Sequence, residues 1–354
     1  MVNIEGKTIG NGNPIYIVFE VGPTHNGLDS AKRLVKAAAD AGADAVKFQI
    51  LDAKRLVRDP SMMVEYGYLA SKKPDIVERY SEPLRDVLVR RGMERHEWIA
   101  LKAYADELGI TFFATASYVE ELNLLDELGC KSVKVASLDI NHHPFLREIA
   151  KRDFCIQLDT GNATLGEIEA AIDILIDEGA DNFIIHHCPS GYPARLQSIN
   201  LRTITTLKQM FNCPIAFSDH TSGWDMDIAA AALGVNLLEK TITEDRCCRS
   251  PEHVMSLEPH ECEAFVNAIR DLEIAMGGTR RRLSKEESDR RAGRRRSAYI
   301  IGGGKSGQRV RDLEIDYSRP GKGLQPDVIE QYLDAKLNKD LEDGHVLNLH
   351  DLEW

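Results

Sequence analysis

Two lysines followed by short polar side chains mark the ends of apolar runs in this sequence. Lys47 and Gln49 close the run DAVKFQI, and Lys134 lies in KSVKVAS. Side chains of a strand alternate between its two faces, so Lys47 and Gln49 share one face and their apolar neighbours share the other. Two ammonium groups with hydroxyls nearby suit a phosphate or carboxylate ligand. The alternative is that each lysine forms a buried ion pair that serves only the structure.

Histidines and carboxylates end the later apolar runs. The residues concerned are His186, His187 and Cys188; Ser218, Asp219 and His220; and Glu239, Lys240 and Thr241. Neutral imidazoles and carboxylates that converge on one rim bind divalent metals, whereas a single histidine is more often a hydrogen-bonded structural residue. A metal beside an anion-binding lysine pair predicts an enzyme that polarises a carbonyl next to a phosphorylated or acidic substrate.

Eight short apolar runs recur between residues 14 and 278, with longer amphipathic stretches between them. The runs cover 15–22, 44–50, 110–116, 131–137, 154–160, 182–188, 214–220 and 236–242. After Thr164, which we expect to cap a helix, apolar residues recur at helical spacing. Eight strands with helices between them predict an α/β fold, a (β/α)8 TIM barrel, with the polar run ends at one mouth. An open doubly wound sheet is the alternative.

The remaining segments predict the domain organisation. Residues 51–109 are too long for one helix, and insertions of this length usually serve the mouth of a barrel. We expect a TIM-barrel domain over 1–283, a charged linker over 284–296 and a small β-rich domain over 297–354. A patch for nucleic acid or an acidic partner is the alternative interpretation of the charged segment.

Composition excludes several function classes. The net charge of −12 argues against general nucleic-acid binding, which needs a broad basic face. No apolar stretch approaches the roughly 18 residues of a membrane span, and the first residues do not resemble a secretory signal. Seven cysteines without paired spacing fit reduced thiols, and we expect the adjacent Cys247 and Cys248 to line a loop. The sequence therefore predicts a cytoplasmic protein that binds neither nucleic acid nor membrane.

Taken together, the motifs resemble a known family. The segment EVGPTHNGLDSAKRLVKAAADAGADAVKFQ, with KVAS, DTGNA, HCPSGYP, FSDHTSGWD, LEKTITEDR and SLEP, resembles the N-acetylneuraminate (sialic acid) synthase family. The stretch from SAYIIG through RPGKG to EDGHVLNLHDLEW is similar to that family's C-terminal SAF (antifreeze-like) domain. The resemblance covers nearly the whole chain, and it is the set of motifs, in order, that makes it specific.

The resemblance implies a reaction and its partners. Phosphoenolpyruvate would condense with an amino-sugar aldehyde such as N-acetylmannosamine, giving a sialic-acid-like nonulosonic acid and phosphate. It also implies a divalent metal, Mn²⁺ or Mg²⁺, that holds and polarises the aldehyde, and a homodimer. Two alternatives are a metal-dependent sugar-phosphate lyase or hydrolase and a catalytically silent sugar-binding relative.

The family pattern also assigns roles to residues of this sequence. The catalytic set is Glu20, Lys47, Gln49 and His220, with His220 as a metal ligand. The substrate-binding set is Thr115, Lys134, Ser137, Asp159, Tyr192, Ser218, Asp219, Glu252 and Arg319. Within that set the pattern places Tyr192, Glu252 and Arg319 on the sugar. Arg319 would reach the active site of the other subunit.

Three departures from the family pattern bear on the metal and the donor. Thr241 stands where the family has a second metal-binding histidine, and we hypothesise that His253 substitutes as metal ligand or sugar contact. Asp159 replaces a serine that helps to hold phosphate, and its carboxylate would repel a phosphate unless it pairs with a lysine or the metal. The usual Ser-Thr-Pro-Phe run is Ala-Thr-Ala-Ser at 114–117. These departures predict a divergent branch with a different acceptor, a shifted metal site or an altered donor.

Overall fold

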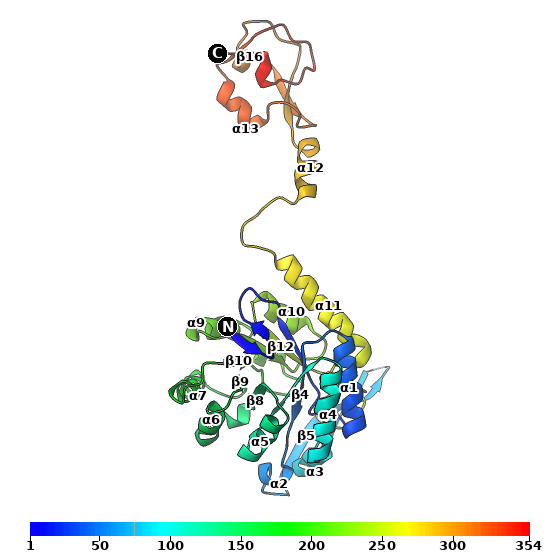
Figure 1. Ribbon diagram of the computed structural model, residues 1–354. Coiled ribbons are helices and arrows are strands. Elements are labelled where there is room, and N and C mark those ends of the chain that lie inside the picture. Colours follow the sequence, from blue (N-terminus) through cyan, green and yellow to red (C-terminus); the bar gives the residue numbers. More distant parts are fainter. Residues whose placement is uncertain (74) are drawn as a thin grey trace. The chain divides into compact units, whose positions relative to one another are not determined.

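The chain forms two compact units. The computed structural model describes residues 1–73 and 75–354, except for the side chain of residue 292. The units are Met1–Gly277 and Gly278–Trp354 (Figure 1). The division comes directly after the long helix α11 (Pro259–Met276).

Eight parallel strands of the first unit close into a barrel. They are β3 (Tyr16–Glu20), β4 (Ala45–Gln49), β7 (Thr111–Thr115), β8 (Ser132–Val135), β9 (Cys155–Asp159), β10 (Phe183–His187), β11 (Ile215–Asp219) and β12 (Leu237–Thr241). The strands are neighbours in chain order, and β12 pairs with β3 to complete the ring. The TIM-barrel prediction is confirmed, and the open-sheet alternative is wrong because both end strands are paired.

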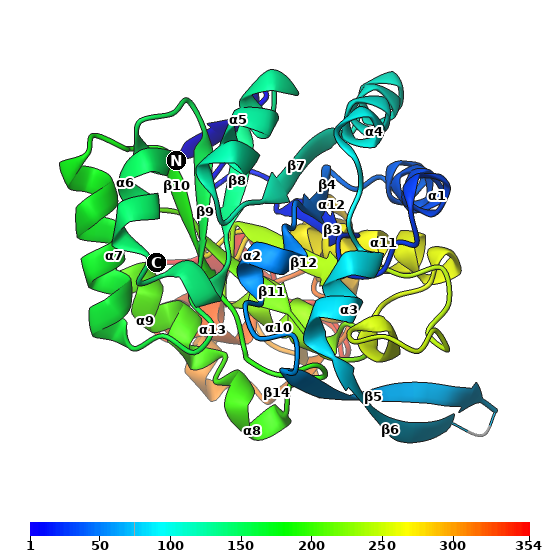
Figure 2. The same cartoon turned by 90° about the horizontal axis from the view of Figure 1, so that it is seen from below.

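Helices that follow the strands surround this barrel (Figure 2). They are α1 (Leu28–Asp40), α4 (Arg95–Glu107), α5 (Val119–Glu127), α6 (His143–Ala150), α7 (Leu165–Asp177), the short α8 (Leu196–Ile199), α9 (Arg202–Met210), α10 (Asp225–Ala232) and α11. Helix α7 begins as predicted, since the Thr164 hydroxyl accepts a hydrogen bond from the Glu167 amide at 3.3 Å.

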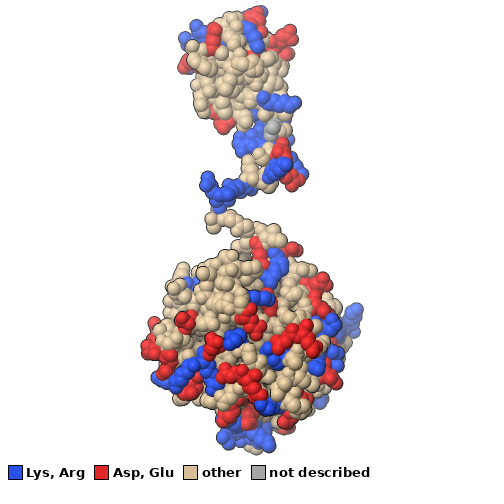
Figure 3. Space-filling model, in the orientation of Figure 1, with Lys and Arg blue, Asp and Glu red and all other residues tan. Residues whose placement is uncertain are grey.

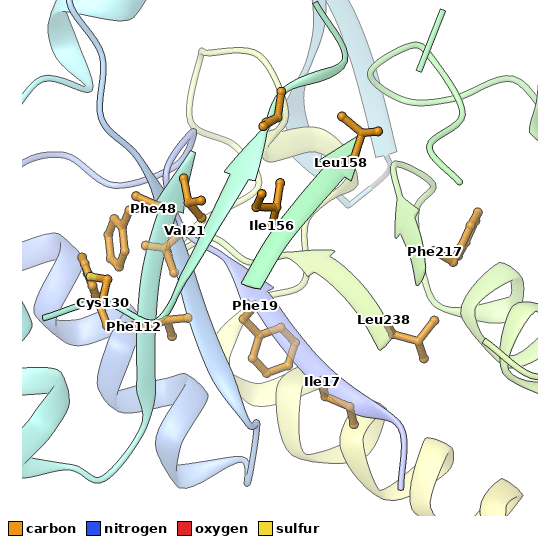
Figure 4. Packing of buried hydrophobic residues seen from close by; sticks show 14 of the residues in the cluster. Ile17, Phe19, Val21, Phe48, Phe112, Cys130, Ile156, Leu158, Phe217 and Leu238 are labelled. Atoms are coloured by element: carbon orange, nitrogen blue, oxygen red, sulfur yellow. The ribbon is translucent and has the colours of Figure 1, made fainter. Parts of the chain in front are cut away.

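The main core lies between the barrel and its helices, on the outward faces of the strands. Figure 4 shows residues of this layer, among them Phe19 of β3 and Phe48 of β4. The rings of Phe48 and Phe112 stack with centroids 5.2 Å apart, and the edge of Trp98 of α4 packs on Phe48. Burial of each such side chain stabilises the fold by roughly 1.5–3 kcal/mol, so this layer fixes the barrel that positions the strand ends.

An N-terminal hairpin closes the end of the barrel at which the strands begin. Strands β1 (Val2–Ile4) and β2 (Lys7–Ile9) pair antiparallel. Val2, Ile4 and Ile9 pack against inward-facing apolar residues near the starts of the barrel strands, such as Val18 and Leu237. This hairpin was not predicted from the sequence. Because it covers the amino ends of the strands, the barrel interior opens at their carboxyl ends.

The long segment between β4 and β7 forms its own small structure. It contains α2 (Ala53–Leu56), β5 (Met63–Lys72), β6 (Asp75–Pro83) and α3 (Leu84–Arg90). Strands β5 and β6 pair antiparallel with a register shift between Leu69 and Ser71. Figure 2 shows this hairpin extending beyond the barrel.

The second unit is small and carries short strands. The charged segment predicted as a linker contains α12 (Lys285–Arg294). Beyond it, β13 (Ser297–Ile300) pairs with β14 (Ile315–Ser318), and β15 (Lys336–Leu337) pairs with β16 (Leu352–Glu353). Helix α13 (Pro326–Ile329) and these strands enclose a separate apolar core.

Charged side chains of both signs are mixed on the face of the barrel unit that Figure 3 shows. Within the described part of the chain, no helix is both long enough and apolar enough to cross a membrane.

Candidate functional site

A cavity of about 360 Å³ opens at the carboxyl ends of the barrel strands. The strands contribute Glu20, Lys47, Gln49, Thr115, Lys134, Asp159 and Glu239 to its lining. The loops that follow the strands contribute Ser117, Ser137, Tyr192, His220 and Glu252. One side is apolar and comes from the inserted segment, through Leu51, Leu56, Val57, Leu84 and Leu88. The site is therefore polar at the barrel and apolar towards the insertion.

The two lysines meet at one carboxylate. Lys47 Nζ lies 2.8 Å from Glu239 Oε1, and Lys134 Nζ lies 2.6 Å from the same oxygen. The Ser218 hydroxyl donates to it as well, at 2.7 Å. Burial acts to raise the pKa of Glu239, but the two ammonium groups outweigh burial and hold that pKa well below its ordinary value. Glu239 is thus a charged carboxylate shared by both lysines, and it was not among the predicted catalytic or substrate-binding residues.

Lys134 also neutralises the carboxylate that replaces the family's serine. Its Nζ lies 2.9 Å from Asp159 Oδ2 and 3.1 Å from Ser218 Oγ, so with Glu239 all three ammonium protons have acceptors. Burial acts to lower the pKa of Lys134, but Asp159 and Glu239 outweigh burial and raise it well above its usual value. Asp159 is therefore paired with a lysine, which reduces its repulsion of an incoming anion.

Glu20 is held at the edge of the cavity by a tight turn. Its Oε1 accepts from the Gly22 amide at 2.7 Å, and its other oxygen pairs with Lys47. A Cβ atom at position 22 would lie 2.6 Å from the Gln49 amide nitrogen and 2.8 Å from Glu20 Oε1, so only glycine fits there. Burial raises the pKa of Glu20 despite the neighbouring lysine, which favours a carboxyl group that can hold a proton.

His220 presents a neutral imidazole to the cavity. Its Nδ1 lies 3.1 Å from the Pro189 carbonyl oxygen, which fixes the proton on Nδ1 and leaves Nε2 for a ligand. Burial lowers the pKa of His220, so the ring is uncharged at neutral pH. The ring of Tyr192 lies beside it, with centroids 4.6 Å apart.

Glu252 and Arg91 form a weaker contact at the same mouth. Glu252 has a φ angle of 78°, which is unusual for a residue other than glycine. Its Oε1 lies 3.7 Å from Arg91 Nη1, and burial raises the pKa of Glu252 to about 7. Arg91 follows α3 in the inserted segment, where no sequence motif marked it.

Asp219 lies apart from the cavity, contrary to the expectation for a substrate contact. It pairs with Lys240, and Asp227 of α10 lies 3.5 Å from the same ammonium group. All three side chains are buried. The strand alternation that turns Ser218 inwards turns Asp219 towards the helix layer, so Asp219 serves structure.

His253 of the barrel unit also lies outside this cavity. His253 Nδ1 is 2.7 Å from the Thr243 hydroxyl, and the His253 ring lines a separate cavity rather than that of His220. Arg319 is exposed and follows β14 in the second unit. Most of the predicted site residues line the main cavity: Glu20, Lys47, Gln49, Thr115, Lys134, Ser137, Asp159, Tyr192, His220 and Glu252. Ser218 contacts Lys134 and Glu239 of the same site.

The other histidines at the strand ends form structural hydrogen bonds. His186 Nε2 lies 2.9 Å from Gln157 Oε1, and His187 Nε2 lies 2.6 Å from the Ile199 carbonyl oxygen. Among the described residues there is no group of three His, Cys, Asp or Glu side chains arranged to hold a metal ion. The predicted metal site depends on several histidines and carboxylates meeting at one point, and the described residues do not provide three such ligands together.

Comparison with known proteins identifies relatives along nearly the whole chain. The NeuB family model matches residues 34–281. An N,N'-diacetyllegionaminic acid synthase of Campylobacter jejuni is 33% identical over 334 residues, which cover 94% of this chain and 98% of that protein. A synthase of the same name from Legionella pneumophila is 32% identical over 346 residues, covering 96% and 95%. A sialic acid synthetase of Leptospira borgpetersenii, solved with citrate, superposes with a TM-score of 0.70 at 30% identity, covering 81% of this chain and 94% of that one.

Proposed function

The chain belongs to the NeuB family and is a transferase-type synthase that forms carbon–carbon bonds, and on that premise we propose that it condenses phosphoenolpyruvate with an amino-sugar aldehyde. The products are a nonulosonic acid and phosphate. The observation that carries this proposal is the convergence of Lys47 and Lys134 on one carboxylate at the mouth of the barrel. Glu20 and His220 line the same cavity.

The two lysines bind the donor in this proposal. When phosphoenolpyruvate enters, its phosphate and carboxylate oxygens accept hydrogen bonds that the two ammonium groups otherwise donate to Glu239 and Asp159. The hydroxyls of Thr115 and Ser137, in the same lining, donate further hydrogen bonds. Three carboxyl groups, those of Glu20, Glu239 and Asp159, face two lysines. The raised pKa of Glu20 makes it the group that takes up a proton, which balances the other two carboxylates against the two ammonium groups. Donor affinity should therefore rise when a carboxyl group is protonated.

Glu20 moves the proton that the reaction requires. As C3 of phosphoenolpyruvate forms a bond to the aldehyde carbon, the aldehyde oxygen gains negative charge and takes the proton from the Glu20 carboxyl group. Water then adds to C2 and returns a proton to Glu20. The C2–O bond breaks next, phosphate leaves with the bonding electrons and the proton of the new C2 hydroxyl, and C2 becomes the ketone of the product. The raised pKa of Glu20 suits a group that must be protonated first.

The acceptor lies between Tyr192, Glu252 and the apolar wall of the insertion. Leu56 and Leu88 of that wall offer a surface for the methyl group of an N-acetyl substituent, while Glu252 offers hydrogen bonds to sugar hydroxyls. The insertion thus sets the choice of acceptor in this proposal.

Two side-chain donors in the cavity are available to the divalent metal, Mn²⁺ or Mg²⁺, of this proposal. His220 offers Nε2, and the buried Oε2 of Glu239 has no hydrogen-bond partner. These two donors fall short of the three protein ligands typical of a catalytic site. A metal bound there would polarise the acceptor carbonyl, but no step described above depends on it.

Replacing Thr241 with histidine tests the metal position. Thr241 is buried at the end of β12, two residues beyond Glu239 on the same face. Outer-shell groups alone change metal affinity about 10–100-fold, so an added direct ligand should tighten Mn²⁺ binding at least about tenfold. Calorimetric titration with Mn²⁺ measures this change. His220→Ala in the Thr241→His background should abolish the gain, and equal affinities in Thr241→His and the parent protein would place the metal elsewhere.

Phosphate release decides between the candidate functions. A panel of amino sugars is incubated with phosphoenolpyruvate and several divalent metals, and products are identified by mass spectrometry. We expect phosphate release only when an amino sugar is present, with a product that contains all carbons of both substrates. Turnover of a sugar-phosphate without phosphoenolpyruvate would instead identify a lyase or hydrolase. Binding without turnover would identify a silent relative.

The proposal extends to assembly and location. We propose a homodimer in which the second unit is a SAF domain that carries Arg319 to the partner's active site. We also propose a cytoplasmic enzyme, consistent with seven cysteines that are all free thiols in the described chain.

A further inference from the structure

A second cavity, of about 270 Å³, lies beside the candidate active site. Its lining includes His25 from the turn after β3, Arg90 and Arg91 from the end of α3, and His253. Arg91 lies between the two cavities, because it lines the second one and its Nη1 is 3.7 Å from Glu252 of the first.

Several buried polar groups of this second cavity lack partners. Arg91 is only 6% exposed, yet its Nε has no hydrogen bond and one Nη2 proton reaches the Pro251 carbonyl at 3.4 Å. A guanidinium has five N–H donors, so most of those on Arg91 are unused. His25 is 4% exposed, and neither of its ring nitrogens has a partner in the described chain. A buried guanidinium that contacts only one carboxylate, at 3.7 Å, and one carbonyl, at 3.4 Å, among the described residues is costly, which indicates that a ligand completes this site.

The local charges favour an anion over a metal ion. Glu82 holds Arg90 through two hydrogen bonds of 2.7 and 2.8 Å, and Glu244 is paired with Arg33, so these charges are compensated. Arg91 remains, with Glu252 as the one carboxylate within 4 Å among the described residues. A metal cation would be repelled by this guanidinium, whereas an anion is attracted to it.

The two histidines of this cavity are uncharged, which also suits an anion held by Arg91. Burial, followed by repulsion from Arg91, lowers the pKa of His25 and of His253 to about 4. Both rings are therefore neutral at pH 7, and each can donate one N–H to an oxygen. The Nδ1 of His253 lies 2.7 Å from the Thr243 hydroxyl, and when that hydroxyl donates to Nδ1 the ring proton is on Nε2, which can donate to a ligand.

We propose that the second cavity binds a small oxyanion of the phosphate type, with Arg91 as its charged partner and His25 and His253 as neutral donors. This site is separate from the two-lysine site and does not depend on the proposed reaction. The anion is either free inorganic phosphate or a phosphate group carried on a sugar, since both present the same oxygens to Arg91.

Calorimetric titration of the full-length protein with inorganic phosphate tests the proposal. Because Lys47 and Lys134 also attract phosphate, the titration is carried out in the Lys134→Gln background. We expect saturable binding to persist there, and Arg91→Gln or His25→Leu to weaken it about tenfold or more. Arg91→Lys keeps the charge and should retain part of the affinity. Arg90→Gln is the matched control, and it should change the affinity less than about threefold because Glu82 already compensates Arg90.

The outcomes separate this site from the proposed active site. Loss of all phosphate binding in a Lys134→Gln protein that is still folded at the titration temperature would overturn the second site and leave the two-lysine site intact. Saturable binding that Arg91→Gln leaves unchanged would overturn it as well. So would Zn²⁺ or Mn²⁺ binding that His25→Leu abolishes, because the cavity would then hold a cation.

A second titration distinguishes the two sources of phosphate. An amino sugar is compared with its 6-phosphate in the parent protein and in Arg91→Gln. If the phosphate is carried on a sugar, Arg91→Gln should weaken only the phosphorylated compound. If free phosphate is the ligand, phosphate and the sugar phosphate should bind the parent protein independently of each other. Equal binding of both sugars by both proteins, without phosphate binding, would contradict the proposal.

Discussion

Replacing Lys134 with alanine is expected to weaken phosphoenolpyruvate binding about 10- to 100-fold while changing sugar binding little. The substitution removes one of the two ammonium groups that meet the donor's phosphate. It also leaves the buried carboxylates of Asp159 and Glu239 without that partner, which should lower the free energy of unfolding by about 3–5 kcal/mol. Calorimetric titration with each substrate separately, together with urea unfolding, measures both effects.

Lys131→Ala is the matched control for this prediction. Lys131 precedes the same strand but is half-exposed and pairs with the exposed Asp153. Its replacement should change donor affinity and stability by less than about 1 kcal/mol. Equal losses of donor and sugar affinity in Lys134→Ala would mean that this lysine does not recognise the donor.

Replacing Lys240 with methionine is expected to destabilise the barrel without altering the active site of any protein that folds. Lys240 is the shared partner of Asp219 and Asp227, and all three are buried between β12, β11 and α10. Its loss leaves the buried Asp219 without its cation and removes the ammonium group beside Asp227, which should cost about 3–5 kcal/mol at neutral pH. Phosphoenolpyruvate affinity should stay within about threefold of the parent value, because these side chains do not line the cavity.

The loss of stability in Lys240→Met should depend on pH. Burial raises the pKa of Asp227 well above the ordinary value, even with Lys240 opposing it. A carboxyl group with a higher pKa in the folded than in the unfolded state makes the protein less stable as pH rises above the unfolded value of about 3.9. Removing Lys240, which opposes this rise in pKa, enlarges that loss of stability in the variant. Urea unfolding should therefore show a smaller deficit for Lys240→Met at pH 5 than at pH 8. The control Lys151→Met, on the exposed surface, should show no loss of stability at either pH. If the loss in Lys240→Met were the same at both pH values, the explanation by buried carboxyl groups would be wrong.

The barrel was predictable because its strands are short, apolar and bounded by turns. The run 44–50, for example, contains β4 at Ala45–Gln49. The N-terminal hairpin was missed because strands of three residues give too short an alternation to detect, and its role in closing the barrel is a tertiary contact.

The candidate site was predictable only in part. Strand alternation places Lys47 in the cavity, and the same rule applied to β11 separates Asp219 from Ser218. Glu239 was recoverable in the same way, because it lies on the inward face opposite Ser218 in the β11–β12 register. Arg91 had no such signal, since its position depends on how the β5–β6 insertion folds against the mouth.

His253 shows why a metal ligand cannot be assigned from sequence distance. It follows Thr241 by twelve residues, yet the chain leads its ring into the cavity of His25 and Arg91 instead of that of His220.

A crystal structure with phosphoenolpyruvate bound tests the central claim most directly. We predict phosphate and carboxylate oxygens within about 3 Å of Lys47 Nζ and Lys134 Nζ, with Glu239 and Asp159 having released part of their contacts. Phosphoenolpyruvate bound in any other cavity, or both lysines still held by their carboxylates at saturating donor, would contradict the claim.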